Sequence, residues 1–140
     1  MLNQINIIMK GFKNNIEKEA LKNENFRKVL YSGKHLQVVL MSLKPGEEIG
    51  METHESTDQF FRFEGGRGKC IIDGNEYKVE NGDAIVVPAG AKHNVINTDS
   101  VNGLKMYTIY APPHHLDGLI NATKKDAETK DVEFDGKTTE

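Results

Sequence analysis

Four side chains in the middle of the chain have the chemistry and the spacing of metal ligands. Glu52 and His54 are two residues apart, so in a β-strand they would project from the same face. Asp58 follows after a short loop, and His93 comes soon after the turn Pro88-Ala89-Gly90. Two imidazoles and two carboxylates form a donor set that suits a divalent first-row metal ion.

This donor set leaves the identity of the metal open. Imidazole ligands favour Fe, Ni, Cu or Zn, whereas two carboxylates shift the preference toward the harder ions Mn(II) and Fe(II). We therefore expect a divalent transition metal, Mn, Fe, Ni or Zn, as a cofactor on Glu52, His54, Asp58 and His93.

The fourth ligand has an alternative in the next residue. Gln59 is also polar, and a shift of one residue in the strand would exchange which of Asp58 and Gln59 faces inward. The alternation of Phe61 and Phe63 against Phe60 and Arg62 indicates that the odd positions share one face. We prefer Asp58, placed on the loop, because an amide is a poorer ligand than a carboxylate.

Short β-type segments have to position these side chains. From Phe26 onward the chain consists of short apolar, β-branched and aromatic runs, which are separated by pairs rich in glycine such as Pro45-Gly46, Gly65-Gly66 and Asn81-Gly82. Such spacing favours an all-β sandwich or barrel. Asp73-Gly74, between two such runs, predicts a two-residue hairpin, and the runs 84–87 and 104–111 predict further strands.

Two stretches resemble the paired motifs of the cupin superfamily. Residues 82–97 match one motif in full, with Gly82, Pro88, Gly90, His93 and Asn97 in place. The other motif is matched from Gly46 to Gly65 or Gly66, with His54 as its second histidine and Asp58 at its glutamate position. Glu52 stands where that motif has its first histidine, which would either alter the metal preference or mark a barrel that has lost its metal.

The resemblance covers roughly residues 36 to 112 and points to small single-domain cupins of the mannose-6-phosphate isomerase-like kind. It implies an all-β fold, a single jelly-roll barrel also described as a double-stranded β-helix. We assign an N-terminal arm with a possible short strand and helix to 1–25, the barrel to 26–113 and a polar tail to 114–140. The tail should be loosely held unless Leu119-Ile120 or 132–134 docks onto the barrel.

The wall of a small-molecule pocket would be mostly apolar with a few polar groups. The same residues could equally form plain barrel core. His114 and His115 are expected at the surface near the barrel rim, and His35 is expected to be exposed. The pocket candidates are Met41, Gln59, Phe61, Phe63, Val95 and Tyr107.

Composition excludes several classes of partner. The net charge of −3 provides no basic surface that would attract nucleic acid or an anionic membrane. The apolar runs are far shorter than the roughly 20 residues of a membrane span. The single cysteine, Cys70, has no partner for an internal disulfide, and no secretory signal pattern is present, so we expect a cytoplasmic protein.

These observations support more than one function. The first is a metal-dependent enzyme on a small polar or sugar-like substrate, with isomerase or epimerase chemistry, as in resembling cupins; a cupin dioxygenase is an alternative. The second is a barrel that binds or senses a small molecule without turnover. A homodimer is expected in either case, and the alternation of Ile5 and Ile7 suggests strand exchange of residues 1–10 between the subunits.

Overall fold

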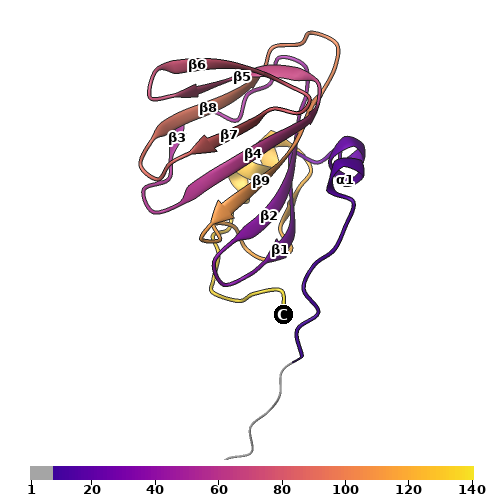
Figure 1. The fold of residues 1–140 in the computed structure, drawn as a ribbon, viewed down its shortest axis with the longest axis vertical. Coiled ribbons are helices and arrows are strands. Elements are labelled where there is room, and N and C mark those ends of the chain that lie inside the picture. Colours follow the sequence, from indigo (N-terminus) through magenta and orange to yellow (C-terminus); the bar gives the residue numbers. More distant parts are fainter. Residues whose placement is uncertain (1–7) are drawn as a thin grey trace, which may run out of the picture.

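A computed structural model describes residues 8–140 of the chain. These residues form ten strands and two short helices (Figure 1). In chain order, the elements are α1 (Ile16–Lys22), β1 (Arg27–Ser32), β2 (Gln37–Leu43), β3 (Glu52–Thr53), β4 (Asp58–Gly65), β5 (Arg67–Ile72), β6 (Asn75–Glu80), β7 (Ala84–Val87), β8 (Lys92–Asn97), β9 (Leu104–Ala111), β10 (Ile120–Asn121) and α2 (Lys124–Thr129).

The strands form two antiparallel sheets that pack face to face. One sheet has six strands in the order β10-β1-β2-β9-β4-β7, and the other has four in the order β3-β8-β5-β6. Strand neighbours that are far apart in sequence, such as β2 and β9, are typical of a jelly roll. The predicted all-β barrel is therefore confirmed.

Alternation of buried and less buried residues along β4 and β9, broken in β4 by the buried Glu64, builds the core between the sheets. In β4 the odd positions Gln59, Phe61 and Phe63 are buried, and in β9 the even positions from Leu104 to Tyr110 are buried. Side chains of alternate residues leave a strand on the same face, so one face of each strand is packed inside, and it is apolar apart from Gln59 and Thr108. Phe61 and Phe63 are fully buried and stack with their ring centroids 6.3 Å apart.

The hairpin predicted at Asp73-Gly74 is confirmed. Ile72 of β5 pairs with Asn75 of β6, which leaves two residues in the loop. Asp73 has a φ of 45° and Gly74 a φ of 81°, as a tight turn with two left-handed residues requires. The strands predicted at 84–87 and 104–111 are also present as β7 and β9.

The N-terminal arm contributes one helix, α1. Asn15 caps it by accepting a hydrogen bond from the Lys18 amide, and Ala20 packs into the protein with no exposed surface. Ile5 and Ile7, on which the strand exchange between subunits was based, lie outside the described residues. The homodimer therefore stays a prediction.

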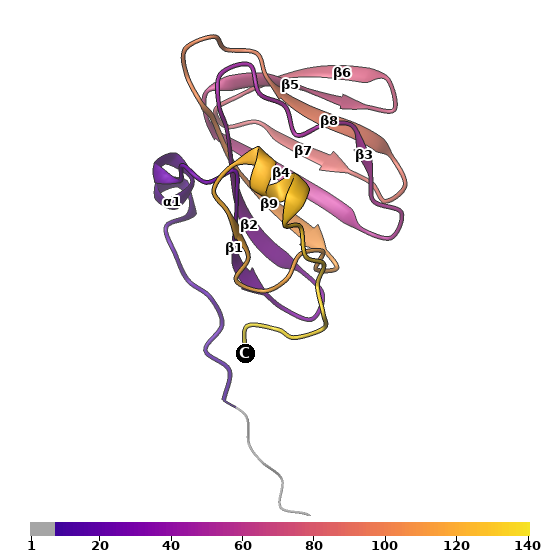
Figure 2. The same ribbon diagram turned by 180° about the vertical axis from the view of Figure 1, so that it is seen from behind.

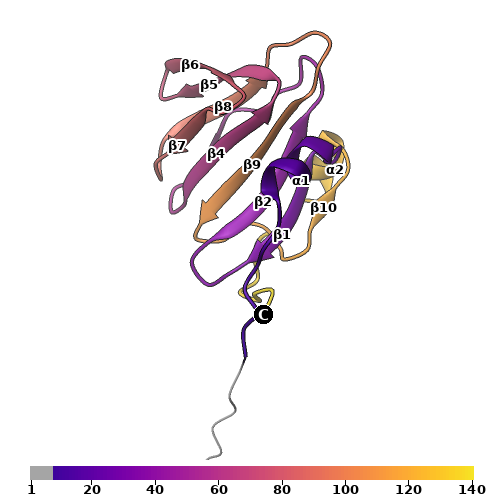
Figure 3. The same ribbon diagram turned by 45° about the vertical axis from the view of Figure 1, so that its right-hand side comes forward.

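The C-terminal segment, residues 112–140, packs against the barrel. The tail is therefore not loosely held, and the docking that we gave as the alternative is present. Strand β10 extends the six-stranded sheet by pairing with β1, and helix α2 buries Ala127 against the core (Figures 2 and 3). Near the end of the chain, Thr139 and Ser32 exchange two hydrogen bonds of 2.8 and 2.9 Å. None of the helices in residues 8–140 is long and apolar enough to cross a membrane.

Candidate metal centre

The strand pair β3–β8 brings two of the predicted ligands together. Glu52 on β3 lies directly opposite His93 on β8, and such cross-strand partners have neighbouring side chains on one face. His54 follows Glu52 by two residues and projects to the same side. The turn before β8 is fixed to this strand because the Gly90 N–H donates a hydrogen bond to the His54 carbonyl, at 2.9 Å.

The three side chains converge on one point. One ligand atom from each of Glu52, His54 and His93 lies within 4.8 Å of the other two. Glu52 Oε1 is 3.3 Å from His54 Nε2 and 3.7 Å from His93 Nε2. Both Nε2 atoms are buried, and neither has a hydrogen-bond partner in the described part of the chain. We refer to Glu52, His54 and His93 as the triad.

These unpartnered nitrogens fit a metal ion. A buried polar atom without a partner is unfavourable, and a cation among the three side chains would satisfy both imidazoles at once. The His93 Nδ1 lies 3.0 Å from the Ala91 carbonyl, which can only accept, so Nδ1 carries a proton and Nε2 is the nitrogen that faces the centre. Metal-ligating histidines are commonly oriented by such a contact.

The charges of the triad also suit a cation. Burial opposes ionisation of Glu52, but the two imidazoles beside it more than compensate, and the pKa of this carboxyl lies well below its ordinary value. Burial lowers the pKa of His93, whereas the Glu52 carboxylate and the Ala91 carbonyl raise it, and the net pKa is above the ordinary value. The triad therefore holds a carboxylate anion beside two imidazoles, and a metal ion would have to displace protons from this centre.

The structure does not bring Asp58 into the triad, which corrects our preference for it as the fourth ligand. Asp58 is exposed, and its Oδ1 accepts a hydrogen bond from the Ala89 N–H at 2.8 Å. Gln59 is the residue that faces inward, with 1% of its surface exposed, and its Nε2 donates to Thr108 Oγ1. The physical reason is strand parity, because Gln59 shares the inner face with Phe61. Asp58 instead fixes the turn that delivers His93.

The prediction that both His114 and His115 lie at the surface is wrong. His115 is 2% exposed, and His114 is half-buried. The His114 ring packs edge-on against the His54 ring, with 4.4 Å between their centroids. Burial and the neighbouring His54 lower the pKa of His114, so it is neutral at neutral pH. His35, by contrast, is exposed as expected.

A line of three polar groups runs from the barrel interior to the C-terminal segment. The Tyr110 hydroxyl lies 3.2 Å from His115 Nε2, and His115 Nδ1 lies 3.3 Å from Asp131 Oδ1. Burial lowers the pKa of His115 to about 4, although Asp131 acts in the opposite direction. With a neutral His115, Tyr110 donates to Nε2 and the protonated Nδ1 faces the Asp131 carboxylate.

Most of the predicted pocket residues lie in the packed core. Met41, Phe61, Phe63 and Val95 belong to the apolar cluster between the sheets. Tyr107 lies at an outward position of β9, where the centroid of its ring is 6.2 Å from that of the Phe60 ring. These five residues do not line the cavity beside the triad.

A small cavity of about 130 Å³ adjoins the triad at Glu52. Strand β1, the loop before β3 and helix α2 border this cavity, which is partly open to solvent, and Figure 2 shows α2 in front of the barrel on this side. Its lining residues are Phe26, Arg27, Ile49, Glu52, Lys124, Ala127, Glu128 and Asp131. Sequence reasoning missed Arg27, although its position two residues before the buried Val29 was a usable signal of an inward side chain.

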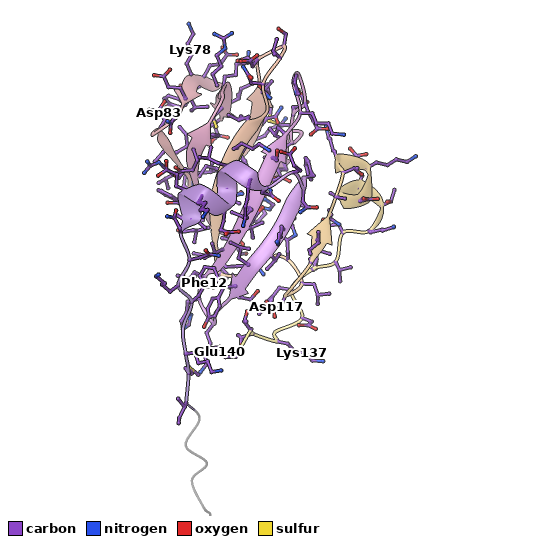
Figure 4. All side chains as sticks on the ribbon, turned by 90° about the vertical axis from the view of Figure 1, so that its right-hand side faces the viewer. Phe12, Lys78, Asp83, Asp117, Lys137 and Glu140 are labelled. Atoms are coloured by element: carbon purple, nitrogen blue, oxygen red, sulfur yellow. The ribbon has the colours of Figure 1, made fainter. Side chains whose placement is uncertain are left out.

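A larger surface depression of about 570 Å³ lies elsewhere, along β5 and β6. Lys78 and Asp83, which help to line it, lie at the end of the molecule opposite to Asp117 and Glu140 (Figure 4). This depression contains none of the triad residues. The cavity beside Glu52 is therefore the one that bears on the candidate metal centre.

Comparisons with known proteins agree with this architecture. Residues 39–110 match the family model described as a cupin domain. The protein YrkC of Bacillus subtilis, which is described as uncharacterized, is 48% identical over 124 residues, and the match covers 84% of this chain and 66% of YrkC. An uncharacterized protein of Acanthamoeba polyphaga mimivirus is 40% identical over 113 residues, with 79% of this chain and 71% of that protein covered.

A solved structure is similar over nearly its whole length. The crystal structure of BH2720 from Bacillus halodurans has a TM-score of 0.84 and 44% sequence identity, with 86% of this chain and 95% of that chain covered. The family match spans just over half of the 140 residues and includes both motif-bearing stretches from Glu52 to His93. The chain therefore belongs to the cupin family and folds as a single cupin barrel.

Proposed function

We propose that this cupin is a metal-dependent enzyme in which Glu52, His54 and His93 hold a divalent ion next to a small substrate cavity. The observation that carries the proposal is the pair of buried, unpartnered Nε2 atoms that face one carboxylate. Three protein ligands leave coordination positions open, as in catalytic rather than purely structural metal sites. The substrate would be a small molecule with an oxygen function, and the chemistry of the isomerase or epimerase kind.

A divalent ion at the triad would supply Lewis acidity, which polarises a carbonyl or lowers the pKa of a bound hydroxyl or water. The chain itself would supply the proton transfer. His114 packs on His54 and is neutral at neutral pH, so its imidazole can accept a proton on the His54 side of the triad, although it does not line the cavity. Helix α2, which forms one wall of the cavity, would restrict the access of water to that substrate.

One observation favours a second candidate, a dioxygenase. Without Asp58, the donor set consists of two imidazoles and one carboxylate, which are the ligand types that hold iron in non-haem Fe(II) oxygenases. Oxygen consumption by the Fe(II)-loaded protein with candidate substrates would distinguish this reaction from an isomerisation, which consumes no oxygen.

The test is the metal content of the protein purified without a histidine tag. We expect about one equivalent of Mn, Fe, Ni or Zn per chain, and its loss in His54→Ala and in His93→Ala. His35→Ala is the matched control, because His35 is exposed and lies outside the triad. Circular dichroism would show that each variant keeps its β-sheet signal.

Two outcomes would contradict the proposal. Equal metal content in the parent and both triad variants would place the ion elsewhere. A parent that takes up no metal after reloading with each of the four ions would instead favour a barrel that binds a small molecule without a metal.

A further inference from the structure

Arg27 is a buried cation whose hydrogen-bonding capacity is largely unused. The residue is 6% exposed, although a guanidinium carries five N–H donors. Among residues 8–140 it makes one hydrogen bond, from Nη1 to Asn121 Oδ1, and this bond is long at 3.4 Å. Its buried Nε has no partner in the same part of the chain. A buried charge with so few hydrogen bonds destabilises the folded protein unless another group supplies the missing contacts.

Within residues 8–140, the guanidinium of Arg27 lies 5.4 Å from the centroid of the Phe26 ring, and its one paired carboxylate is distant. Asp131 Oδ1 lies 4.0 Å from Nη1, beyond hydrogen-bonding distance, and the Asp131 side chain is 45% exposed. The same Oδ1 atom is closer to His115 Nδ1, at 3.3 Å. Asp131 therefore does not satisfy the guanidinium, and Arg27 keeps free donors.

Arg27 and one residue of the triad, Glu52, line the same cavity. The space of about 130 Å³ is lined by two cations, Arg27 and Lys124, and by three carboxylates, Glu52, Glu128 and Asp131. A divalent ion on the triad would turn this small excess of negative charge into an excess of positive charge, with the metal at one side and Arg27 at the other. An anion that spans the two would meet a favourable charge at each end.

We propose that Arg27 is the anion-binding group of the substrate site, and that the substrate is a small carboxylate with a hydroxyl or carbonyl oxygen on the adjacent carbon. Arg27 would hold the carboxylate through two parallel N–H donors, the geometry in which guanidinium recognises carboxylate. The neighbouring oxygen would face the triad. This assignment rests on the proposed metal-dependent function, to which it adds the class of substrate.

The size of the cavity restricts the class further. Its volume of about 130 Å³ is small beside the roughly 300 to 1,000 Å³ typical of drug-sized ligand sites. This small volume favours a two- or three-carbon hydroxy or oxo acid as the part of the ligand that enters the cavity.

The experiment compares two probes on the metal-loaded full chain by titration calorimetry. Glycolate has the proposed carboxylate, and ethylene glycol replaces it with a neutral hydroxymethyl group. We expect the parent to prefer glycolate by about 10- to 100-fold, as for a hydrogen-bonded charge pair. Arg27→Gln should lose that preference and keep the metal content of the parent. Arg67→Gln is the matched control, because the Arg67 side chain is 70% exposed and lies outside this cavity.

Each result separates this proposal from the metal assignment. Equal binding of both probes by the parent, or an undiminished preference in Arg27→Gln, would overturn the role of Arg27 while metal content stands. If the parent holds no metal, the proposed function fails, and the same preference measured on the metal-free chain still tests Arg27. If Arg27→Gln does not fold, Arg27→Lys keeps the charge but loses the paired donors, and should bind glycolate at least several-fold more weakly than the parent.

Discussion

His115 should make the stability of the protein depend on pH in the mildly acidic range. The imidazole is almost completely buried between Tyr110 and Asp131, and the pKa of His115 is lowered from 6.5 to about 4. Burial is the main cause, with Arg27 and His114 acting in the same direction and Asp131 against them. The perturbation to test is His115→Gln, which keeps a polar side chain but removes the titration.

The sign follows from proton uptake. In the unfolded chain His115 takes up a proton near pH 6.5, whereas in the folded chain it does so only near pH 4. Between these values the unfolded state binds more protons, so the stability contributed by neutral His115 is present above pH 6.5 and is lost as the pH falls toward 4. For these two pKa values the loss between pH 7 and pH 5 is about 2 kcal/mol.

Urea unfolding of the parent and of His115→Gln at several pH values between 5 and 7 measures this loss. Both proteins will respond to their other titrating groups, so the informative quantity is the difference between the two slopes. The free energy of unfolding should fall more steeply in the parent, by about 2 kcal/mol over the interval. His35→Gln, which removes an exposed histidine, should follow the parent.

Parallel pH profiles for the parent and His115→Gln would refute the reasoning. They would mean that the imidazole is protonated with equal ease in the folded and unfolded chains. The packing of the C-terminal segment over His115 would then have to be more open than the contacts with Tyr110 and Asp131 indicate.

Two further substitutions test the supports of the site. Asp58→Ala should leave the metal content unchanged and lower the free energy of unfolding by about 1 kcal/mol, because the Ala89 N–H loses its acceptor; loss of metal would restore Asp58 as a ligand. Gln37→Ala should destabilise the protein by about 2 to 4 kcal/mol in urea unfolding, since this buried amide bonds Ser32 and the His115 backbone. A change below about 0.5 kcal/mol would show that these bonds do not hold the C-terminal segment.

The barrel and the core of the site were accessible from sequence because local patterns determine them. The two-residue spacing of Glu52 and His54 needs only the pleat of a strand. The Pro88-Ala89-Gly90 turn returns the chain so that His93 faces the same point, and the match to the cupin motif supplied the pairing between the two stretches. Turn residues likewise marked the strands of the two sheets.

The prediction that Asp58 rather than Gln59 faces inward was wrong by one residue of strand register. The parity of Phe61 and Phe63 already placed Gln59 on the inner face, and that indication was stronger than the ligand preference of a carboxylate over an amide. Side-chain chemistry cannot decide a position that the alternation of the strand has already decided.

The contacts of the C-terminal segment could not be predicted from local patterns. His115 is positioned by Gln37 and Asp131, and Arg27 by Asn121, all through contacts between distant parts of the sequence. An apolar pair such as Leu119-Ile120 is too short to show a periodicity. It is nevertheless long enough to form a strand when the edge of β1 is available for pairing. A polar composition therefore indicated disorder where specific hydrogen bonds provide the order.

The triad and part of the cavity wall come from different parts of the chain, which has a consequence for how such proteins diversify. The triad is drawn from strands in the middle of the chain, whereas Lys124, Glu128 and Asp131 reach the cavity from the segment that follows the barrel. If the triad holds a metal and the cavity a small molecule, as we propose, substitutions in that segment would alter which molecule fits without moving a metal ligand. Descendants of one ancestral barrel would then keep the metal site while selection changes ligand preference at the cavity wall.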